Sequence, residues 1–381
     1  MLPLSLFAIT RPALAAFAAM GILWGTFAAV LPDLKTMLAV NEAQLGILIL
    51  FTPIAAVAAM LVAPVIGALL GRVVLPVVVL AMAASFSLPG QAASLLLFAL
   101  AMMAAGATTG LTDVLMNARV AQMENERGLS LMNLAHAAYS FGYAAAALLT
   151  GALRSAGWSP GAVMGTMALL AALLALATWE RNGRIQGLTR PTGETVGGLG
   201  PLPVIGGGIV LIAFLTENAA ENWSALHIEQ TLGGSPAEGA MGPAALALTM
   251  GIARIAGQGL VNRVSPFALL RVGAMISACG ALGAAGATSP AFAYLGFIVM
   301  GIGSSVIAPT AFTLVGRLAR PEARARAIAR ATLLGYFGYF FGPPLLGFVA
   351  GSFGLRMAFV FAAIVLMGVL ALVPFLQRRV G

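Results

Sequence analysis

A few acidic, amide and histidine side chains interrupt the long apolar runs of this sequence. Asp113 and Asn117 lie in one run, His136 lies in the next, and Glu217 and Glu221 lie in a later one. A charged or strongly polar side chain at bilayer depth costs several kcal/mol unless it faces a partner or a wet cavity. These residues are therefore candidates for hydrogen-bonding a polar solute and for accepting and releasing protons.

The composition indicates a protein that crosses a membrane many times. Of 381 residues, 60% are hydrophobic and only 8% are charged, and the mean hydropathy is +1.00. A soluble domain carries roughly a quarter charged residues, and a spanning helix needs about 20 apolar residues. Short polar or Gly/Pro segments divide the sequence into twelve such runs, so we expect an all-α membrane protein with twelve transmembrane helices. The expected helices cover residues 12–38, 43–70, 73–88, 92–123, 129–156, 161–179, 204–229, 237–262, 266–287, 291–319, 325–352 and 355–376.

The helices are expected to form two pseudo-symmetric bundles of six. The longest polar stretch, residues 181–203, predicts a flexible cytoplasmic linker between an N-terminal bundle at 1–180 and a C-terminal bundle at 204–381. A short internal match supports the duplication, because SFGYAAAALLTG at 140–151 aligns with YFGYFFGPPLLG at 336–347. In transporters built from such repeats, the site lies near the bilayer midplane.

The basic residues predict the orientation of the chain. The formal net charge is +8, but the 20 lysines and arginines are scattered singly at the ends of apolar runs. If the N-terminus is cytoplasmic, most of them fall on the inside, and only Lys35, Arg154 and Arg356 fall on the outside. This bias follows the positive-inside rule and predicts that both termini are cytoplasmic. Nucleic-acid binding is not expected, because a basic groove with interleaved aromatic residues is absent.

Other chemistries lack their sequence signatures. The chain has no phosphate-binding GxxxxGK[ST] motif, which disfavours an ATP-driven pump. Two histidines and one cysteine, Cys279, supply neither a credible metal cluster nor an intrachain disulfide. We therefore expect no enzyme activity, no metal and no cofactor.

Several motifs resemble one protein family. They are DVLMN at 113–117, Glu124, Met132, HAAYSFG at 136–142, and ENAAENWS at 217–224. Together with the helix pattern, they make the chain similar to the major facilitator superfamily over essentially its whole length. More narrowly, it resembles the bacterial branch that groups rhizopine (methylated inositol-amine) transporters with relatives of the fucose permease.

The chain departs from that branch in its seventh helix. The branch typically has E-G-x-x-x-D-W-S there, whereas this chain has Asn222 in place of the second acid and Glu221 one position earlier. One position turns the carboxylate about 100° round the helix. The acid to which the resemblance assigns proton coupling is therefore expected on a different face of the helix in this chain.

The spacing of the N-terminal candidates predicts a polar cluster. Asp113 and Asn117 are four residues apart, so they share a helix face, and Asp113 is expected close to the midplane. His136 is expected at the depth of Asn117 on the following helix. Asp113 could bind substrate hydroxyl groups or a proton. The alternative is a closed structural network that joins the two helices.

The C-terminal candidates predict a second cluster. Glu217 and Glu221 share a helix face, and Arg254 of the next helix is expected within reach of Glu217. Such an ion pair could lock one conformation and yield to a proton or to substrate, or it could be permanent and simply make Arg254 tolerable in the bilayer. The remaining candidates either contact substrate or serve in packing and interfacial anchoring, and they are Asn218, Trp223, Trp24, Tyr139 and Tyr336.

These observations predict a secondary transporter. We expect proton-coupled uptake of a small sugar, polyol or inositol-like solute by alternating access, carried out by a monomer in the bacterial inner membrane. The expected partners are the solute, protons and the lipid bilayer. Two alternatives stay open, namely a drug or metabolite exporter of the same fold and a non-transporting membrane sensor. The alanines of 144–147 stand where drug antiporters have a glycine–proline pattern, which disfavours export.

Overall fold

The computed structural model describes residues 4–128, 131–186, 188, 199–256, 264–320 and 323–378. All secondary structure in these residues is helical, and each of the twelve predicted ranges overlaps one α-helix. The helices are α1 (Leu4–Leu38), α2 (Glu42–Leu70), α3 (Val74–Phe86), α4 (Leu95–Arg127), α5 (Met132–Ser155), α6 (Pro160–Ala177), α7 (Leu202–Leu226), α8 (Pro236–Ala256), α10 (Pro266–Gly286), α11 (Pro290–Leu318), α12 (Arg324–Phe353) and α13 (Leu355–Gln377).

Serine–proline pairs mark where several helices begin. The pairs at 159–160, 235–236, 265–266 and 289–290 each place proline at the first position of α6, α8, α10 or α11. Proline suits this position, because its missing N–H would be unpaired anyway and its φ is already helical. Ser159 and Ser265 also accept hydrogen bonds from the backbone N–H three residues further on.

Some predicted boundaries were wrong at the helix starts. We expected the first helix to begin at residue 12, but α1 begins at Leu4 and contains Pro12 in its interior. A proline inside a membrane helix is tolerated where the freed carbonyl finds another donor. The fourth helix begins at Leu95 rather than at residue 92, since Ser94 caps it by accepting from the Leu97 N–H at 3.2 Å. The predicted end of the eighth helix at 262 lies outside the described residues.

Ten segments of the described chain are long and apolar enough to cross a membrane. One of them, Glu42–Gln91, contains both α2 and α3, and α5 is not among the ten. The chain is thus an all-α multi-pass membrane protein. The count of twelve spans stays a prediction.

The chain forms two compact units. Unit 1 comprises Met1–Ala39 and Phe51–Pro191, and unit 2 comprises Val40–Leu50 and Thr192–Gly381. The predicted bundles at 1–180 and 204–381 stay a prediction, because much of the predicted linker at 181–203 lies outside the described residues.

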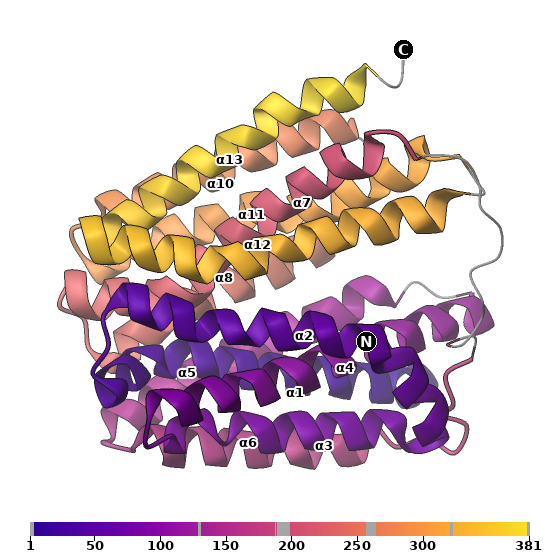
Figure 1. Ribbon diagram of the computed structural model, residues 1–381, viewed down its shortest axis with the longest axis horizontal. Helices are drawn as coiled ribbons and strands as arrows, with labels where there is room; N and C mark the ends of the chain where they lie inside the picture. The colour runs from indigo at the N-terminus through magenta and orange to yellow at the C-terminus, as the bar shows by residue number, and fades with distance from the viewer. Residues whose placement is uncertain are drawn as a thin grey trace. The chain divides into compact units, whose positions relative to one another are not determined.

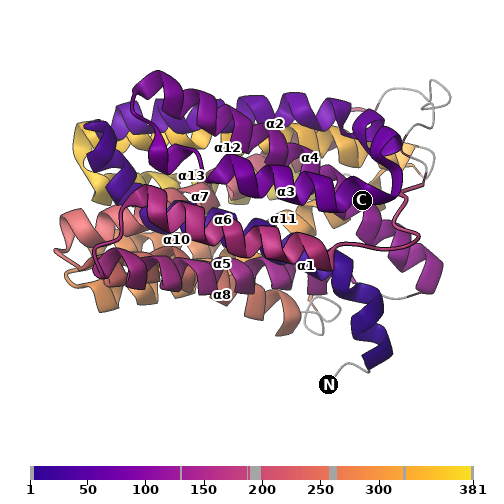
Figure 2. The same cartoon turned by 90° about the horizontal axis from the view of Figure 1, so that it is seen from below.

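The same packing order recurs in both units. In unit 1, α1 packs against α5 and α6, and α3 packs against α4 and α6 (Figure 1; Figure 2). In unit 2, α7 packs against α12 and α13, and α10 packs against α11 and α13 (Figure 1). The helices α7, α10, α11, α12 and α13 of unit 2 therefore pack against one another in the same order as α1, α3, α4, α5 and α6 of unit 1.

Glycines bring α1 close to α5 and thereby place the predicted site residues of α5. A Cβ added to Gly21 would lie 2.1 Å from the Tyr139 carbonyl oxygen, and one added to Gly25 would lie 2.1 Å from the Tyr143 carbonyl oxygen. Only glycine permits this approach, because two helix backbones meet there. In unit 2, Gly338 plays the same part, since its Cβ would lie 2.4 Å from the Leu211 carbonyl oxygen of α7.

Candidate functional site

The α4 candidates of unit 1 bond to each other. Asn117 Nδ2 donates to the Asp113 carbonyl oxygen at 2.8 Å and to Asp113 Oδ1 at 3.0 Å. Both side chains are half-buried. The four-residue spacing predicted this shared face. The amide holds one carboxylate oxygen in place, so the pair presents an oriented acceptor on the α4 surface.

The α5 candidates lie against aromatic side chains. His136 contacts Phe17 of α1 edge-to-face, with ring centroids 5.0 Å apart, and the Tyr139 ring lies 6.0 Å from that of Tyr143. Both His136 and Tyr139 are half-buried. Phe17 and Gly21 of α1 thus fix the positions of these two polar side chains.

Trp24 of α1 belongs to an aromatic cluster that joins α1 to α3. Its ring makes edge-to-face contacts with Phe27 at 5.6 Å and with Phe86 of α3 at 5.1 Å. Such contacts contribute ~1 kcal/mol each beyond area burial. The indole is half-buried, so packing occupies only part of its surface.

The α7 candidates of unit 2 are more deeply buried than those of α4. Glu217, Asn218 and Asn222 are each 5% exposed. Among the described residues, neither Glu217 Oε1 nor Asn218 Oδ1 has a hydrogen-bond partner. A buried polar atom without a partner costs ~1–3 kcal/mol, and more if it is charged. The α7 sequence therefore maintains an unfavourable arrangement.

Arg254 of α8 lies within electrostatic range of both α7 carboxylates, Glu217 and Glu221, and attracts each of them. Glu221 and Arg254 are both half-buried. The predicted cluster of these three ionisable residues stays a prediction, and this attraction supports it. An arginine near two carboxylates leaves one negative charge to be neutralised by another positive group or by a proton.

Trp223 is fully buried, with 0% of its surface exposed. Its indole reaches α12, where a Cβ added to Gly347 would lie 3.2 Å from the ring. This position does not suit an anchor at the membrane surface, which needs contact with headgroups. Within the described part of the chain, Trp223 Nε1 has no acceptor.

Tyr336 of α12 lies beside the α7 cluster. Phe214 of α7 stacks on Tyr339 with ring centroids 4.6 Å apart and contacts Tyr336 at 6.0 Å. Asn218 is one turn along α7, and a Cβ added to Gly342 of α12 would lie 3.2 Å from its Oδ1 atom. The α7–α12 interface therefore combines aromatic rings with the Asn218 amide.

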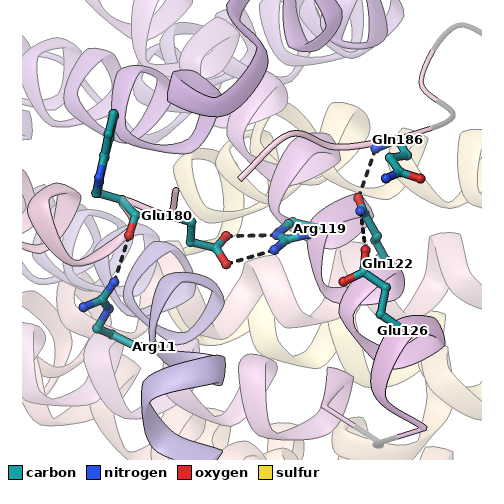
Figure 3. Close-up of polar contacts among 7 residues, drawn as sticks. Arg11, Arg119, Gln122, Glu126, Glu180 and Gln186 are labelled. Carbon is teal, nitrogen blue, oxygen red and sulfur yellow. Dashed lines mark hydrogen bonds and ion pairs between the residues drawn. The ribbon is translucent and has the colours of Figure 1, made fainter. Parts of the chain in front are cut away.

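Sequence reasoning missed two ion pairs of unit 1. Arg119 of α4 donates from Nε and Nη2 to the two carboxylate oxygens of Glu180, each at 2.9 Å (Figure 3). Arg154 of α5 donates to both oxygens of Asp33 at 2.6 and 2.7 Å. Each arginine stands out within an apolar run. Its acidic partner could not be found from the sequence, because Asp33 lies on α1 and Glu180 lies just after α6, both distant along the chain.

The first residues of the predicted linker lie against α4. The Gln186 N–H donates to Gln122 Oε1 at 3.0 Å, and Gln122 Nε2 donates to Glu126 at 2.6 Å (Figure 3). Residues 181–186 are therefore held against unit 1.

No group of three potential metal ligands occurs in the described ranges.

Comparisons with known proteins agree with this fold. The Major Facilitator Superfamily matches residues 205–380. An uncharacterized MFS-type transporter of Yersinia pestis is 31% identical over 368 residues, covering 93% of this chain and 92% of that protein. The membrane protein MosC of Rhizobium meliloti is 24% identical over 355 residues, covering 92% of this chain and 85% of MosC. The chain belongs to the Major Facilitator Superfamily, and it is a multi-pass membrane transporter rather than an enzyme.

Solved structures of transporters share the fold. A bacterial homolog of the human lysosomal transporter Spinster, in an inward-facing and occupied conformation, matches with a TM-score of 0.75 and 17% identity, covering 99% of this chain and 98% of that one. The fucose:proton symporter FucP of E. coli matches with a TM-score of 0.61 and 16% identity, covering 98% of each chain. The predicted major facilitator fold is confirmed.

Proposed function

We propose that this transporter couples the uptake of a small polar solute, a sugar, polyol or inositol derivative, to the movement of protons by alternating access. The observation that carries the proposal is the buried Glu217 carboxyl, whose Oε1 atom has no hydrogen-bond partner in the described chain. A carboxylate in such surroundings is unstable unless a proton or a cation neutralises it. Glu217 is therefore the residue that would carry the coupled proton.

Arg254 gives this proton a competitor. Its positive charge attracts Glu217 and Glu221, so Arg254 and a proton compete for the same carboxylates. Proton binding would weaken the hold of Arg254 on α7, and proton release would restore it. A two-state contact of this kind can bias a transporter between conformations.

The polar groups near Glu217 fit a solute rich in hydroxyl groups. Asn218 Oδ1 offers an acceptor that no donor of the described residues occupies, and Tyr336 and Phe214 of the same interface offer aromatic rings. Sugar recognition commonly combines amide hydrogen bonds with an apolar ring face. In unit 1, the Asp113–Asn117 pair and His136 stay separate candidates for binding solute. The resemblance to the rhizopine-transporter and fucose-permease branch supports the same solute class.

The setting follows from the distribution of charge. We infer that the protein acts as a monomer in the bacterial inner membrane. We also infer that both termini lie in the cytoplasm, because the arginines gather at the ends of helices that the positive-inside rule places inside.

Two measurements test the proposed function. A thermal-shift screen of the purified protein against sugars, inositols and amines identifies a solute, and proteoliposomes then report uptake of that solute with and without an imposed pH gradient. We expect uphill uptake with the gradient, and its loss when a protonophore collapses the gradient. Uptake that ignores the gradient would refute proton coupling. Extrusion of the solute would instead favour an exporter, and binding without flux would favour a sensor.

A further inference from the structure

Two neighbouring cavities lie on unit 1, away from the predicted transport residues. Their volumes are about 270 Å³ and about 610 Å³, and both are lined by Arg119, Arg127, Glu180 and Arg181. They occur where the end of α4 meets the segment that follows α6. The larger volume is within the ~300–1,000 Å³ of typical small-molecule sites. None of the residues assigned to transport lines either cavity.

Positive charge dominates the lining of these cavities. The described lining residues include only two acids, Glu126 and Glu180, and the latter pairs with Arg119 (Figure 3), so the arginines outnumber the acids. Apart from Arg119, the lining arginines are exposed at their surface. The arginines are Arg11, Arg72, Arg119, Arg127, Arg181 and Arg184. We call this region the arginine pocket.

Arg119 gives the pocket an unused donor. The residue is only 6% exposed, and its Nε and Nη2 atoms are taken by Glu180. Its Nη1 atom has no hydrogen-bond partner among the described residues. Burying a guanidinium nitrogen without an acceptor is costly, so the arrangement is incomplete until an acceptor enters. Arginine clusters bind phosphate oxygens well, since the planar guanidinium matches their geometry.

The surroundings indicate a lipid as the source of that phosphate. Trp179, at the end of α6, is 44% exposed, and the Arg72 guanidinium carbon lies 6.0 Å from its ring centroid. Arg11 donates to the Trp179 carbonyl oxygen at 2.8 Å (Figure 3). Exposed tryptophan at the end of a membrane helix belongs at headgroup level. We propose that the arginine pocket binds the phosphate of an anionic phospholipid headgroup.

The test measures lipid binding to the full-length protein. Lipid-stripped protein in neutral detergent is titrated with phosphatidylglycerol, with phosphatidylcholine and, separately, with inorganic phosphate, and bound ligand is counted by native mass spectrometry. One double variant, Arg127→Gln with Arg181→Gln, removes two exposed arginines of the pocket. The matched control, Arg317→Gln with Arg320→Gln, removes two exposed arginines of unit 2.

We expect phosphatidylglycerol to bind more tightly than phosphatidylcholine, and the pocket variant to weaken it by about tenfold while the control changes it little. Arg119→Lys keeps the charge but removes the unused donor, so it should weaken binding at constant net charge. Equal losses in both double variants would overturn the proposal by showing diffuse surface attraction. Saturable binding of inorganic phosphate that depends on Arg127 and Arg181, without preference for phosphatidylglycerol, would overturn the lipid source.

Discussion

The predicted site residues of unit 1 and unit 2 differ in whether their polar atoms have hydrogen-bond partners. In unit 1, Asn117 bonds to Asp113 and Arg154 pairs with Asp33, whereas the Nη1 atom of Arg119, which has no partner among the described residues, belongs to the arginine pocket rather than to the predicted transport residues. In unit 2, α7 buries Glu217 and Asn218 with an oxygen of each left without a partner in the described chain. Both units have the same helix packing order, so the fold itself does not require this difference.

Because of this difference, substitutions in the two units should affect stability and transport differently. Completed hydrogen bonds between buried groups contribute modestly to stability, but breaking one leaves a costly orphan. A buried polar group that already lacks a partner destabilises the native state, so removing that group should stabilise it. We therefore expect substitutions in the unit 1 pairs to lower stability, and substitutions in the α7 cluster to lower transport without lowering stability.

The largest effect is expected at Glu217. Glu217→Gln is isosteric with the protonated acid and cannot release a proton, so uphill uptake in proteoliposomes should fall to background while solute exchange across the membrane continues. The melting temperature should stay the same or rise, because a buried ionisable group is lost. Uptake and melting are measured on the same preparation.

A matched glutamate controls for the change of side chain. Glu238 is exposed and accepts from the Ser235 N–H at 2.8 Å at the start of α8, and glutamine retains such a capping contact. Glu238→Gln should therefore leave uptake and melting unchanged. Uphill uptake at the wild-type rate by Glu217→Gln would contradict the proposed proton carrier.

The next effect is expected at the Arg154–Asp33 pair of unit 1. The Arg154 side chain is 1% exposed, so Asp33→Asn leaves a buried guanidinium without its counter-charge. Breaking a buried pair costs about 3–5 kcal/mol, and the partial exposure of Asp33 places this case at the lower end. Melting should move down accordingly, whereas uptake per folded molecule should persist.

A double variant isolates the uncompensated charge as the cause. Arg154→Met combined with Asp33→Asn removes both charges and should recover most of the lost stability. If Asp33→Asn abolishes uptake at an unchanged melting temperature, then the pair belongs to the transport mechanism and the separation between the units fails.

The sequence allowed prediction of features that depend on neighbouring residues. Apolar run length and the polar or Gly/Pro segments between runs placed the helices, and four-residue spacing placed Asn117 beside Asp113 on one face. Where a local signal misled, as at Pro12, the reason was that a membrane helix can continue through proline.

Features that depend on which helices pack together could not be predicted. The partner of Arg119 is 61 residues away, and that of Arg154 is 121 residues away. The full burial of Trp223 depends on its approach to α12, which the sequence of α7 does not contain. Similarly, the missing partner of Glu217 Oε1 is a property of the assembled interior.

The smallest effect gives the sharpest comparison, because the same substitution should change stability with opposite signs in the two units. Leucine matches asparagine in shape, so Asn117→Leu removes the bond to Asp113 and should lower the unfolding free energy by about 1 kcal/mol. Asn218→Leu removes an oxygen that has no partner in the described chain, and should leave stability unchanged or raise it by a similar amount. Thermal melting gives both signs.

Uptake kinetics complete this comparison. If Asn218 Oδ1 accepts a hydrogen bond from the solute, Asn218→Leu raises KM for uptake even as the protein becomes more stable, since the lost bond is made only when solute is present. Destabilisation by Asn218→Leu would show that its oxygen has a partner in the resting protein. That result would remove the contrast between α4 and α7, because both helices would then carry satisfied polar groups.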